Sequence, residues 1–181
     1  MKKSDCKEFT DNLNIDKPIY KQKNTKKPLN KWIITSIVLF ILAYYISNNW
    51  YQLMLIQGES MSPSYHNLQM VILNRHSSDY TYGDVVAFKC ERLDSVLVKR
   101  IVACPCDVVV IDQGTLYVNG DISAVFPETG LFEYEGILDE KIQLGTGQYI
   151  VIGDNTRESK DSRYEEVGYI DESNIIGKVV R

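Results

Sequence analysis

An uncharged apolar run near the N-terminus constrains this chain most. The run "WIITSIVLFILAYYISNNWY", residues 32–51, contains no Asp, Glu, Lys or Arg. A helix of that length extends about 30 Å, which is the thickness of the hydrocarbon core of a bilayer. Trp32, Trp50 and Tyr51 lie at its ends, where aromatic rings prefer to sit. The run therefore predicts a single transmembrane helix, with the later residues forming a separate domain.

A cleaved secretory signal is the alternative explanation of this run. The 31 residues before it are long for a signal peptide, and no pair of small residues follows Ala43. Tyr44, Tyr45 and Ile46 are too large for a cleavage site of the Ala-x-Ala kind. An uncleaved anchor is favoured.

Charge is distributed unevenly on the two sides of the run. Residues 1–31 hold nine lysines and four acidic residues, whereas the rest of the chain holds 11 basic and 20 acidic residues. No Lys or Arg follows the run before Arg75, so the positive-inside rule predicts a flexible cytoplasmic tail at 1–31 and an extracytoplasmic domain at 52–181. An acidic domain with a basic tail argues against nucleic acid as a partner and favours an anionic lipid surface.

The four cysteines are compatible with the oxidising side of a membrane. Cys6 would be cytoplasmic and free. Cys104 and Cys106 flank a proline and are too close for an unstrained mutual disulfide, whereas Cys90 can pair with either of them if their strands are neighbours. A metal site built from these three and His76 has only a weak signal, and we expect no metal and no cofactor.

The region beyond the run predicts a mainly β domain. Its apolar segments are short, rich in Val, Ile, Tyr and Phe, and separated by turn signals, while no 3.6-residue periodicity is visible. "GTLYVNGD" predicts a strand that enters a two-residue hairpin turn. We expect antiparallel β-sheet, or a partly open barrel, with an acidic, turn-rich insertion or cap at 121–147. The predicted strands are 69–73, 84–88, 96–102, 108–111, 115–118, 148–152 and 175–180.

A hydrolase in this domain needs a nucleophile and a base. His66 and His76 lie in polar, loop-like surroundings that do not favour a catalytic role. Lys99 lies in "SVLVKRIVA", an apolar run, and a lysine becomes a base if burial without a carboxylate partner lowers its pKa. Because a mid-strand lysine usually faces solvent, this run alone leaves the role of Lys99 open.

Four short blocks give the chain a family resemblance. In order they are "GESMSPS" from Gly58, "GDVVAF" from Gly83, "VKRIVACPCD" from Val98 and "GDNTRESKDSR" from Gly153. With the apolar run before them, these blocks resemble the boxes of bacterial type I signal peptidases. The resemblance implies a signal-peptidase-like β domain after one membrane anchor. It also implies a membrane-bound serine endopeptidase that removes N-terminal signal peptides from secretory preproteins, using a Ser/Lys dyad.

The resemblance also implies roles for individual residues. Ser60 matches the nucleophile and Lys99 the general base, while Ser159 matches a hydroxyl that holds the lysine in place. Asp161 and Arg163 match a supporting charged pair. Five further positions match the substrate-binding pockets: Ile56, Met61, Tyr65, Leu97 and Val98.

The oxyanion of the tetrahedral intermediate is expected at the Ser60 backbone N–H. The second donor is left open, because Gly58 stands where Gram-negative relatives carry a serine. The family usually has G-x-P-G-D where this chain has residues 103–107, "ACPCD", and we expect a changed turn because Cys tolerates positive φ poorly. Asp154 is expected to be structural, through hydrogen bonds within its turn.

Two other functions fit the sequence less well than cleavage of preproteins. A catalytically silent relative that assembles surface proteins such as pilins would be expected to have lost Ser60 or Lys99, and both are present. A self-cleaving repressor is disfavoured by the membrane run and by the lack of a helix-turn-helix. The expected partners are secretory preproteins and the lipid bilayer, with a monomeric enzyme contacting the secretion translocon.

Overall fold

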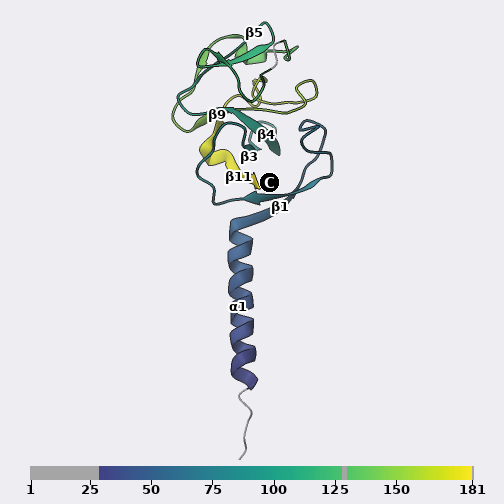
Figure 1. Cartoon of the computed structure of the whole chain (residues 1–181), viewed down its shortest axis with the longest axis vertical. Coiled ribbons are helices and arrows are strands. Elements are labelled where there is room, and N and C mark those ends of the chain that lie inside the picture. The colour runs from purple at the N-terminus through teal and green to yellow at the C-terminus, as the bar shows by residue number, and fades with distance from the viewer. Residues whose placement is uncertain (1–28, 128–129, 181) are drawn as a thin grey trace, which may run out of the picture. The chain divides into compact units, whose positions relative to one another are not determined.

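The computed structural model describes residues 29–127 and 130–180 (Figure 1). The chain divides into two compact units, residues 1–40 and 41–181, and helix α1 (Leu29–Trp50) contributes residues to both. Within the described residues, no helix meets the length and hydropathy required of a membrane span. The predicted span is helical, its insertion into a membrane stays a prediction, and residues 1–28 of the predicted tail lie outside the described part.

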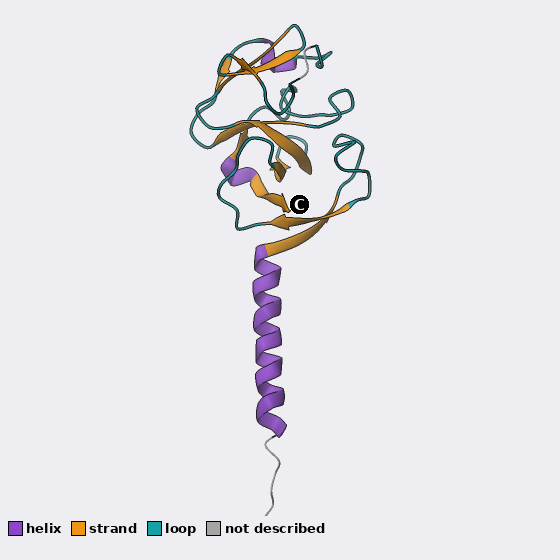
Figure 2. Cartoon of the chain, viewed as in Figure 1, coloured by secondary structure: helices purple, strands orange, loops and turns teal. Residues whose placement is uncertain are grey.

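The second unit is mainly β, as predicted, and is built from two antiparallel sheets (Figure 2). The seven-stranded sheet has the order β1-β2-β11-β3-β4-β9-β10, and the four-stranded sheet has the order β7-β6-β5-β8. Neither sheet closes into a barrel in the described residues. The larger sheet comprises β1 (Tyr51–Leu55), β2 (Met70–Asn74), β3 (Val85–Cys90), β4 (Ser95–Ala103), β9 (Gln148–Ile152), β10 (Ile170–Asp171) and β11 (Ile175–Val180). The smaller comprises β5 (Val108–Asp112), β6 (Thr115–Val118), β7 (Asp121–Ile122) and β8 (Ile142–Gln143), and 3-10 turns cover Gly136–Asp139 and Glu172–Asn174.

All seven predicted strands are present, with shifts at their ends. Strand β1 was not predicted, because Tyr51 ends the apolar run and no turn signal separates it from the helix. The hairpin prediction is confirmed, since Val118 pairs with Asp121 and the two intervening residues, Asn119 and Gly120, have φ of 57° and 91°. Positive φ at both central positions is what a two-residue hairpin turn requires.

Strands β3 and β4 are neighbours in the middle of the larger sheet (Figure 1). Most residues of β3 and the second half of β4 are buried on both faces. Each has an almost unbroken apolar sequence, as expected of strands covered on two sides. One face carries Val86 and Phe88 into a core shared with β9, and the other carries Val85 and Ala87 into a core shared with β2 and β11. In the second half of β4, from Lys99 to Ala103, every side chain is buried, the two charged ones included.

The segment predicted as an insertion or cap at 121–147 contributes to a third core. Phe126, Phe132, Leu138 and Leu144 are buried with side chains of β5, β6 and β9. Burying a phenylalanine or leucine contributes on the order of 2 kcal/mol to stability. This segment is therefore a structural part of the domain, with side chains that cannot vary freely.

Candidate active site

Ser60 lies in a loop that begins where β1 ends. The loop is closed at its base by two backbone hydrogen bonds, from Ile56 N–H to Gln69 O (2.9 Å) and from Leu68 N–H to Ile56 O (2.8 Å). Met61 is fully buried and anchors the loop in the core shared by β2, β3 and β11. Ser60 is the neighbour of this anchor, and it remains half-buried at the surface of the loop.

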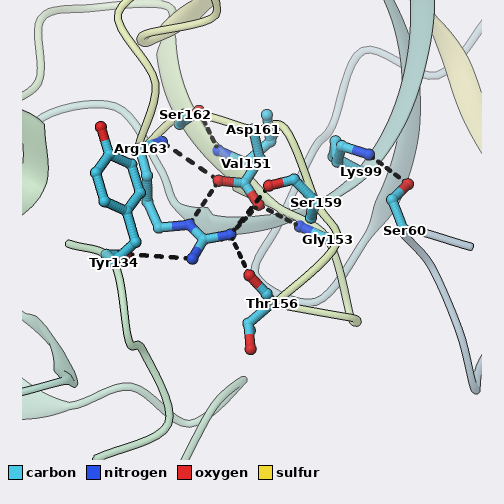
Figure 3. Close-up of polar contacts among 10 residues, drawn as sticks. All are labelled: Ser60, Lys99, Tyr134, Val151, Gly153, Thr156, Ser159, Asp161, Ser162 and Arg163. Atoms are coloured by element: carbon cyan, nitrogen blue, oxygen red, sulfur yellow. Dashed lines mark hydrogen bonds and ion pairs between the residues drawn. The ribbon is translucent and has the colours of Figure 1, made fainter. Parts of the chain in front are cut away.

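Lys99 lies on β4 and reaches the same serine. Its Nζ donates to Ser60 Oγ at 2.6 Å, although the two residues are 39 positions apart (Figure 3). Only 3% of Lys99 is exposed, and its strand partner is the fully buried Val86. The hypothesis of a solvent-facing Lys99 is therefore wrong.

Burial also changes the acid–base chemistry of Lys99. Desolvation lowers the pKa of its ammonium from 10.5 to about 8, against the opposing fields of Asp161 and Asp154, while Arg163 lowers it further. No carboxylate among the described residues forms an ion pair with Lys99. A buried amine without a contacting carboxylate can be neutral close to physiological pH, and a neutral amine can accept a proton.

Asp161 and Arg163 form a buried ion pair next to this site (Figure 3). Arg163 donates to Asp161 through Nε (2.8 Å) and Nη2 (2.9 Å), and both residues are at most 1% exposed. Asp161 also accepts from Gly153 N–H (3.1 Å). A buried charged pair needs further hydrogen bonds to offset its desolvation, and this one has them.

The remaining guanidinium donors of Arg163 connect two segments of backbone. Nη1 donates to Tyr134 O, and Nη2 donates to Thr156 O and Ser159 O. The N–H of Ile137 in turn donates to Arg163 O (2.9 Å). The segment 121–147 thus holds the loop that carries Ser159, a role with no sequence signal because it uses main-chain groups.

Ser159 is fully enclosed, and its Oγ has no hydrogen-bond partner among the described residues. The predicted contact with Lys99 is absent from the hydrogen bonds of the described residues. Both Ser159 and Ser60 lie against Gly153, which is possible because glycine has no Cβ. A Cβ there would be 2.2 Å from Ser159 Oγ and 2.5 Å from the backbone carbonyl oxygen of Ser60. Gly153 was not among the residues predicted for the site.

Arg100, which follows Lys99, points to the opposite face of β4. It forms a two-point ion pair with Asp154, with 2.7 Å between Nε and Oδ1, and it donates to Gly83 O and Ser64 Oγ. This pairing raises the pKa of Arg100. Asp154 was expected to bond within its own turn, and instead it joins that turn to β4.

The structure does not bring all five predicted substrate-binding residues together. Ile56, Met61 and Tyr65 are buried in the core shared by β2, β3 and β11, with Val98 packed against them. Leu97 packs against the other core, because neighbouring residues of a strand face opposite sides. A cleft of about 1110 Å³ borders this region and is lined by Tyr65 but by neither member of the dyad.

His66 and His76 are the alternative candidates for the base. Both are exposed, and the ring of His76 stacks on Trp50 with 4.9 Å between centroids. Neither imidazole hydrogen-bonds to Ser60 in the described part of the chain. Among the same residues, no cluster of His, Cys, Asp and Glu could hold a metal ion.

The cysteines correct two expectations. Cys90, Cys104 and Cys106 are all free, so the predicted disulfide is absent. Cys106 has φ of 71°, so this cysteine adopts the left-handed conformation that favours glycine. The premise that a cysteine would avoid positive φ at this position is therefore wrong.

Comparison with known proteins identifies the family. Residues 29–181 match the family described as "Signal peptidase, peptidase S26". The chain belongs to this family. The chain is 32% identical over 172 residues to a protein named signal peptidase IB from Staphylococcus aureus, covering 85% of this chain and 88% of that protein. It is 28% identical over 167 residues to signal peptidase I from Bacillus licheniformis, covering 87% and 89%.

A crystal structure of a signal peptidase I from Enterococcus faecalis superposes with a TM-score of 0.46 at 24% identity. It covers 57% of this chain and 98% of that one. The assignment to the signal peptidase family rests on the match over residues 29–181 and on the S. aureus relative.

Proposed function

We propose that this chain is a type I signal peptidase, a serine endopeptidase that removes N-terminal signal peptides from secretory preproteins. Membership of the signal peptidase family supports this activity. One observation carries the mechanism: the buried Lys99 Nζ lies 2.6 Å from Ser60 Oγ, with its pKa lowered to about 8. The silent assembly factor has no comparable support, because both dyad members are present and in contact.

In this mechanism Ser60 is the nucleophile and Lys99 the general base. The neutral amine accepts the Oγ proton while Oγ attacks the carbonyl carbon at the scissile bond, forming a tetrahedral intermediate. Lys99 then gives the proton to the leaving amine, and the C–N bond breaks to leave an ester on Ser60. Water, deprotonated by the same amine, hydrolyses the ester and releases the signal peptide.

The remaining residues support the dyad. Asp161 and Arg163 hold the loop of Ser159 and Gly153, so that a hydroxyl and a backbone without Cβ border the nucleophile. Ser159 Oγ is buried and has no partner within 29–127 and 130–180, and it is therefore available to bind the neutral amine when Lys99 releases Ser60. No metal or cofactor takes part in these steps.

We further propose that α1 anchors the enzyme in the membrane, with the tail in the cytoplasm and the catalytic domain outside. Apolar side chains of α1 such as Ile33, Val38 and Phe40 are at least half exposed, which suits contact with lipid. The lysines before residue 32 support the orientation. A monomeric state and contact with the translocon stay predictions.

The test of the proposed function is cleavage of a preprotein by the full chain in detergent or vesicles. The preprotein should carry alanine at the first and third residues before the scissile bond (positions −1 and −3), because we expect the enzyme to cut after a small residue. Wild type should release the mature protein, whereas Ser60→Ala should not. Cleavage by Ser60→Ala at the wild-type rate, or no cleavage of any preprotein by wild type, would contradict the proposal.

A further inference from the structure

The peptide bond between Glu59 and Ser60 is held on its carbonyl side by two donors. Glu59 O accepts from Ser62 N–H at 3.0 Å and from the side-chain Nδ2 of Asn155 at 3.3 Å. The backbone N–H of Asn155 donates to Ser60 O at 3.0 Å. Asn155, from the loop after β9, therefore binds the main chain on both sides of the nucleophile.

The other side of the same peptide is open. Among the described residues, none accepts a hydrogen bond from the Ser60 N–H. This peptide is trans, because the one cis bond of the described part is Ser62–Pro63. In a trans peptide the N–H points away from the carbonyl oxygen, so a group that fixes the Glu59 carbonyl also fixes the direction of the Ser60 N–H.

We propose that Asn155 is a positioning residue for the oxyanion donor: its side-chain amide fixes the Glu59–Ser60 peptide so that the Ser60 N–H meets the developing oxyanion. This inference rests on the proposed function. Asn155 acts through the peptide and does not touch the substrate carbonyl, because Glu59 O and the Ser60 N–H point in opposite directions. No role was predicted for Asn155 from the sequence.

Two physical effects follow from this contact. It opposes rotation of the peptide plane, so the Ser60 N–H is already oriented when negative charge develops on the substrate oxygen. A donor that is oriented beforehand contributes most, because it need not reorganise during the reaction. A hydrogen bond to the carbonyl also polarises the peptide and strengthens its N–H as a donor, by roughly 10–30% per bond.

The site depends on this arrangement because Gly58 supplies no hydroxyl. Its φ is 90°, a conformation that a serine would adopt only with strain. With no side-chain donor at that position, the Ser60 N–H carries a larger share of the oxyanion stabilisation.

The test compares Asn155→Leu with wild type in cleavage of the preprotein. Leucine has nearly the shape of asparagine and lacks the donor, while the backbone N–H that binds Ser60 O is retained. Loss of an oxyanion donor itself lowers kcat by about 10²–10³-fold, so loss of the group that orients it should lower kcat by about 10-fold. KM should stay within about twofold, and the pH midpoint set by Lys99 should not move.

Two further variants separate positioning from structure. Asn155→Gln keeps the amide donor and should recover a substantial part of the loss in kcat. Arg157→Ala alters an exposed residue of the same loop, whose side chain is 76% exposed and pairs with Glu133, and should cleave at the wild-type rate. Thermal unfolding midpoints of the variants should lie close to that of wild type.

A binding measurement gives a readout that a merely structural role would not move. The probe is a peptide aldehyde ending in alanine: Ser60 Oγ adds to the aldehyde carbon, the Oγ proton passes to Lys99, and the aldehyde oxygen becomes the oxyanion. Asn155→Leu should weaken aldehyde binding by about 10-fold. It should leave unchanged the affinity of the uncleaved preprotein, measured in a Ser60→Ala background.

The outcomes distinguish the inference from the proposed function. Unchanged kcat in Asn155→Leu, or equal weakening of aldehyde and uncleaved preprotein, overturns the positioning role while leaving the peptidase intact. A wild type that neither cleaves the preprotein nor binds the aldehyde overturns the proposed function. A selective loss of kcat and aldehyde affinity, recovered in Asn155→Gln, supports the inference.

Discussion

Gly153 and Ser159 approach so closely that a Cβ on the glycine would lie 2.2 Å from the serine Oγ. The same Cβ would lie 2.5 Å from the backbone carbonyl oxygen of Ser60, the residue that carries the nucleophile. Real Cβ atoms do not approach other atoms so closely, so one of the two segments must move when Gly153 gains a side chain.

We predict that Gly153→Ala lowers cleavage of the preprotein by at least about 10-fold, since a shift of 1 Å at a reacting group can cost 10²-fold. Gly145→Ala is the matched control, because a Cβ there meets only the end of the flexible Gln148 side chain, at 3.0 Å. Initial rates of cleavage measure the effect. Equal rates for the two variants would show that the nucleophile does not need this space.

The pH dependence of cleavage should follow the Lys99 amine. Lys99 is active as a base only when neutral, so kcat/KM should rise with pH to a midpoint near 8, well below the 10.5 of an ordinary lysine. Lys99→Arg should be as inactive as Lys99→Ala, because guanidinium keeps its proton at any workable pH. Substantial cleavage by Lys99→Arg would exclude the dyad and return attention to His66 and His76.

The same burial should make Lys99 costly to stability. The unfolded state binds more protons than the folded state between about pH 8 and 10.5, so the stability contributed by this group rises with pH through that window. At pH 7 the cost is fully present. Replacing the ammonium by an apolar chain of similar length in Lys99→Met should therefore raise the free energy of unfolding by about 2 kcal/mol.

Denaturant unfolding of the inactive Lys99→Met variant measures this gain. Its advantage over wild type should shrink when the measurement is repeated at pH 10. An advantage that is absent at pH 7, or that grows with pH, would mean that Lys99 is not destabilised by burial.

The Arg100–Asp154 pair should contribute to stability far more than the exposed pairs. The two side chains are 10% and 8% exposed, so Asp154→Asn leaves a buried guanidinium without its counter-charge. We predict a loss of about 3 kcal/mol in the free energy of unfolding. Glu133→Gln, which breaks the exposed pair with Arg157, should cost less than about 1 kcal/mol in the same assay.

Cys106 occupies a backbone conformation that suits glycine. Its φ of 71° should cost about 1 kcal/mol relative to glycine, so Cys106→Gly should stabilise the protein by about that amount. Cys106→Ala removes the thiol but keeps the Cβ, and should not stabilise. A gain of equal size in Cys106→Ala would point to the thiol and not the backbone as the cause.

The sequence predicted the β architecture well, because its signals are local. Strand positions follow from runs of Val, Ile, Tyr and Phe between turn residues, and the Asn119–Gly120 turn has a backbone that few other pairs adopt. Strand β1 lacked such a boundary. Its first residue continues the apolar run of the helix, so nothing local marks the change from helix to strand.

The candidate site was predictable only where side chains carry the chemistry. Ser60 and Lys99 were found through motif resemblance, because the apolar run around Lys99 did not by itself decide whether this lysine faces solvent. The carbonyl of Tyr134 and the N–H of Ser62 that binds Glu59 O have no sequence signal, because every residue except proline carries the same groups. The side chain of Asn155 was missed because its partner is a backbone carbonyl 96 positions away. The partner of Asp154 was missed because an ion pair between residues 54 positions apart depends on the register of two strands.

Lys99 and Arg100 are adjacent cations that the alternation of β4 sends to opposite faces. Strand β4 is paired with β3 through the four-residue turn 91–94, so the length of that turn decides which cation reaches Ser60. A shift of one residue would place the guanidinium at the nucleophile and the ammonium at Asp154. The shift would leave the guanidinium buried without its counter-charge, and a guanidinium cannot accept the proton of Ser60. The turn 91–94 therefore sets both the pairing of Arg100 and the presence of a base at the nucleophile.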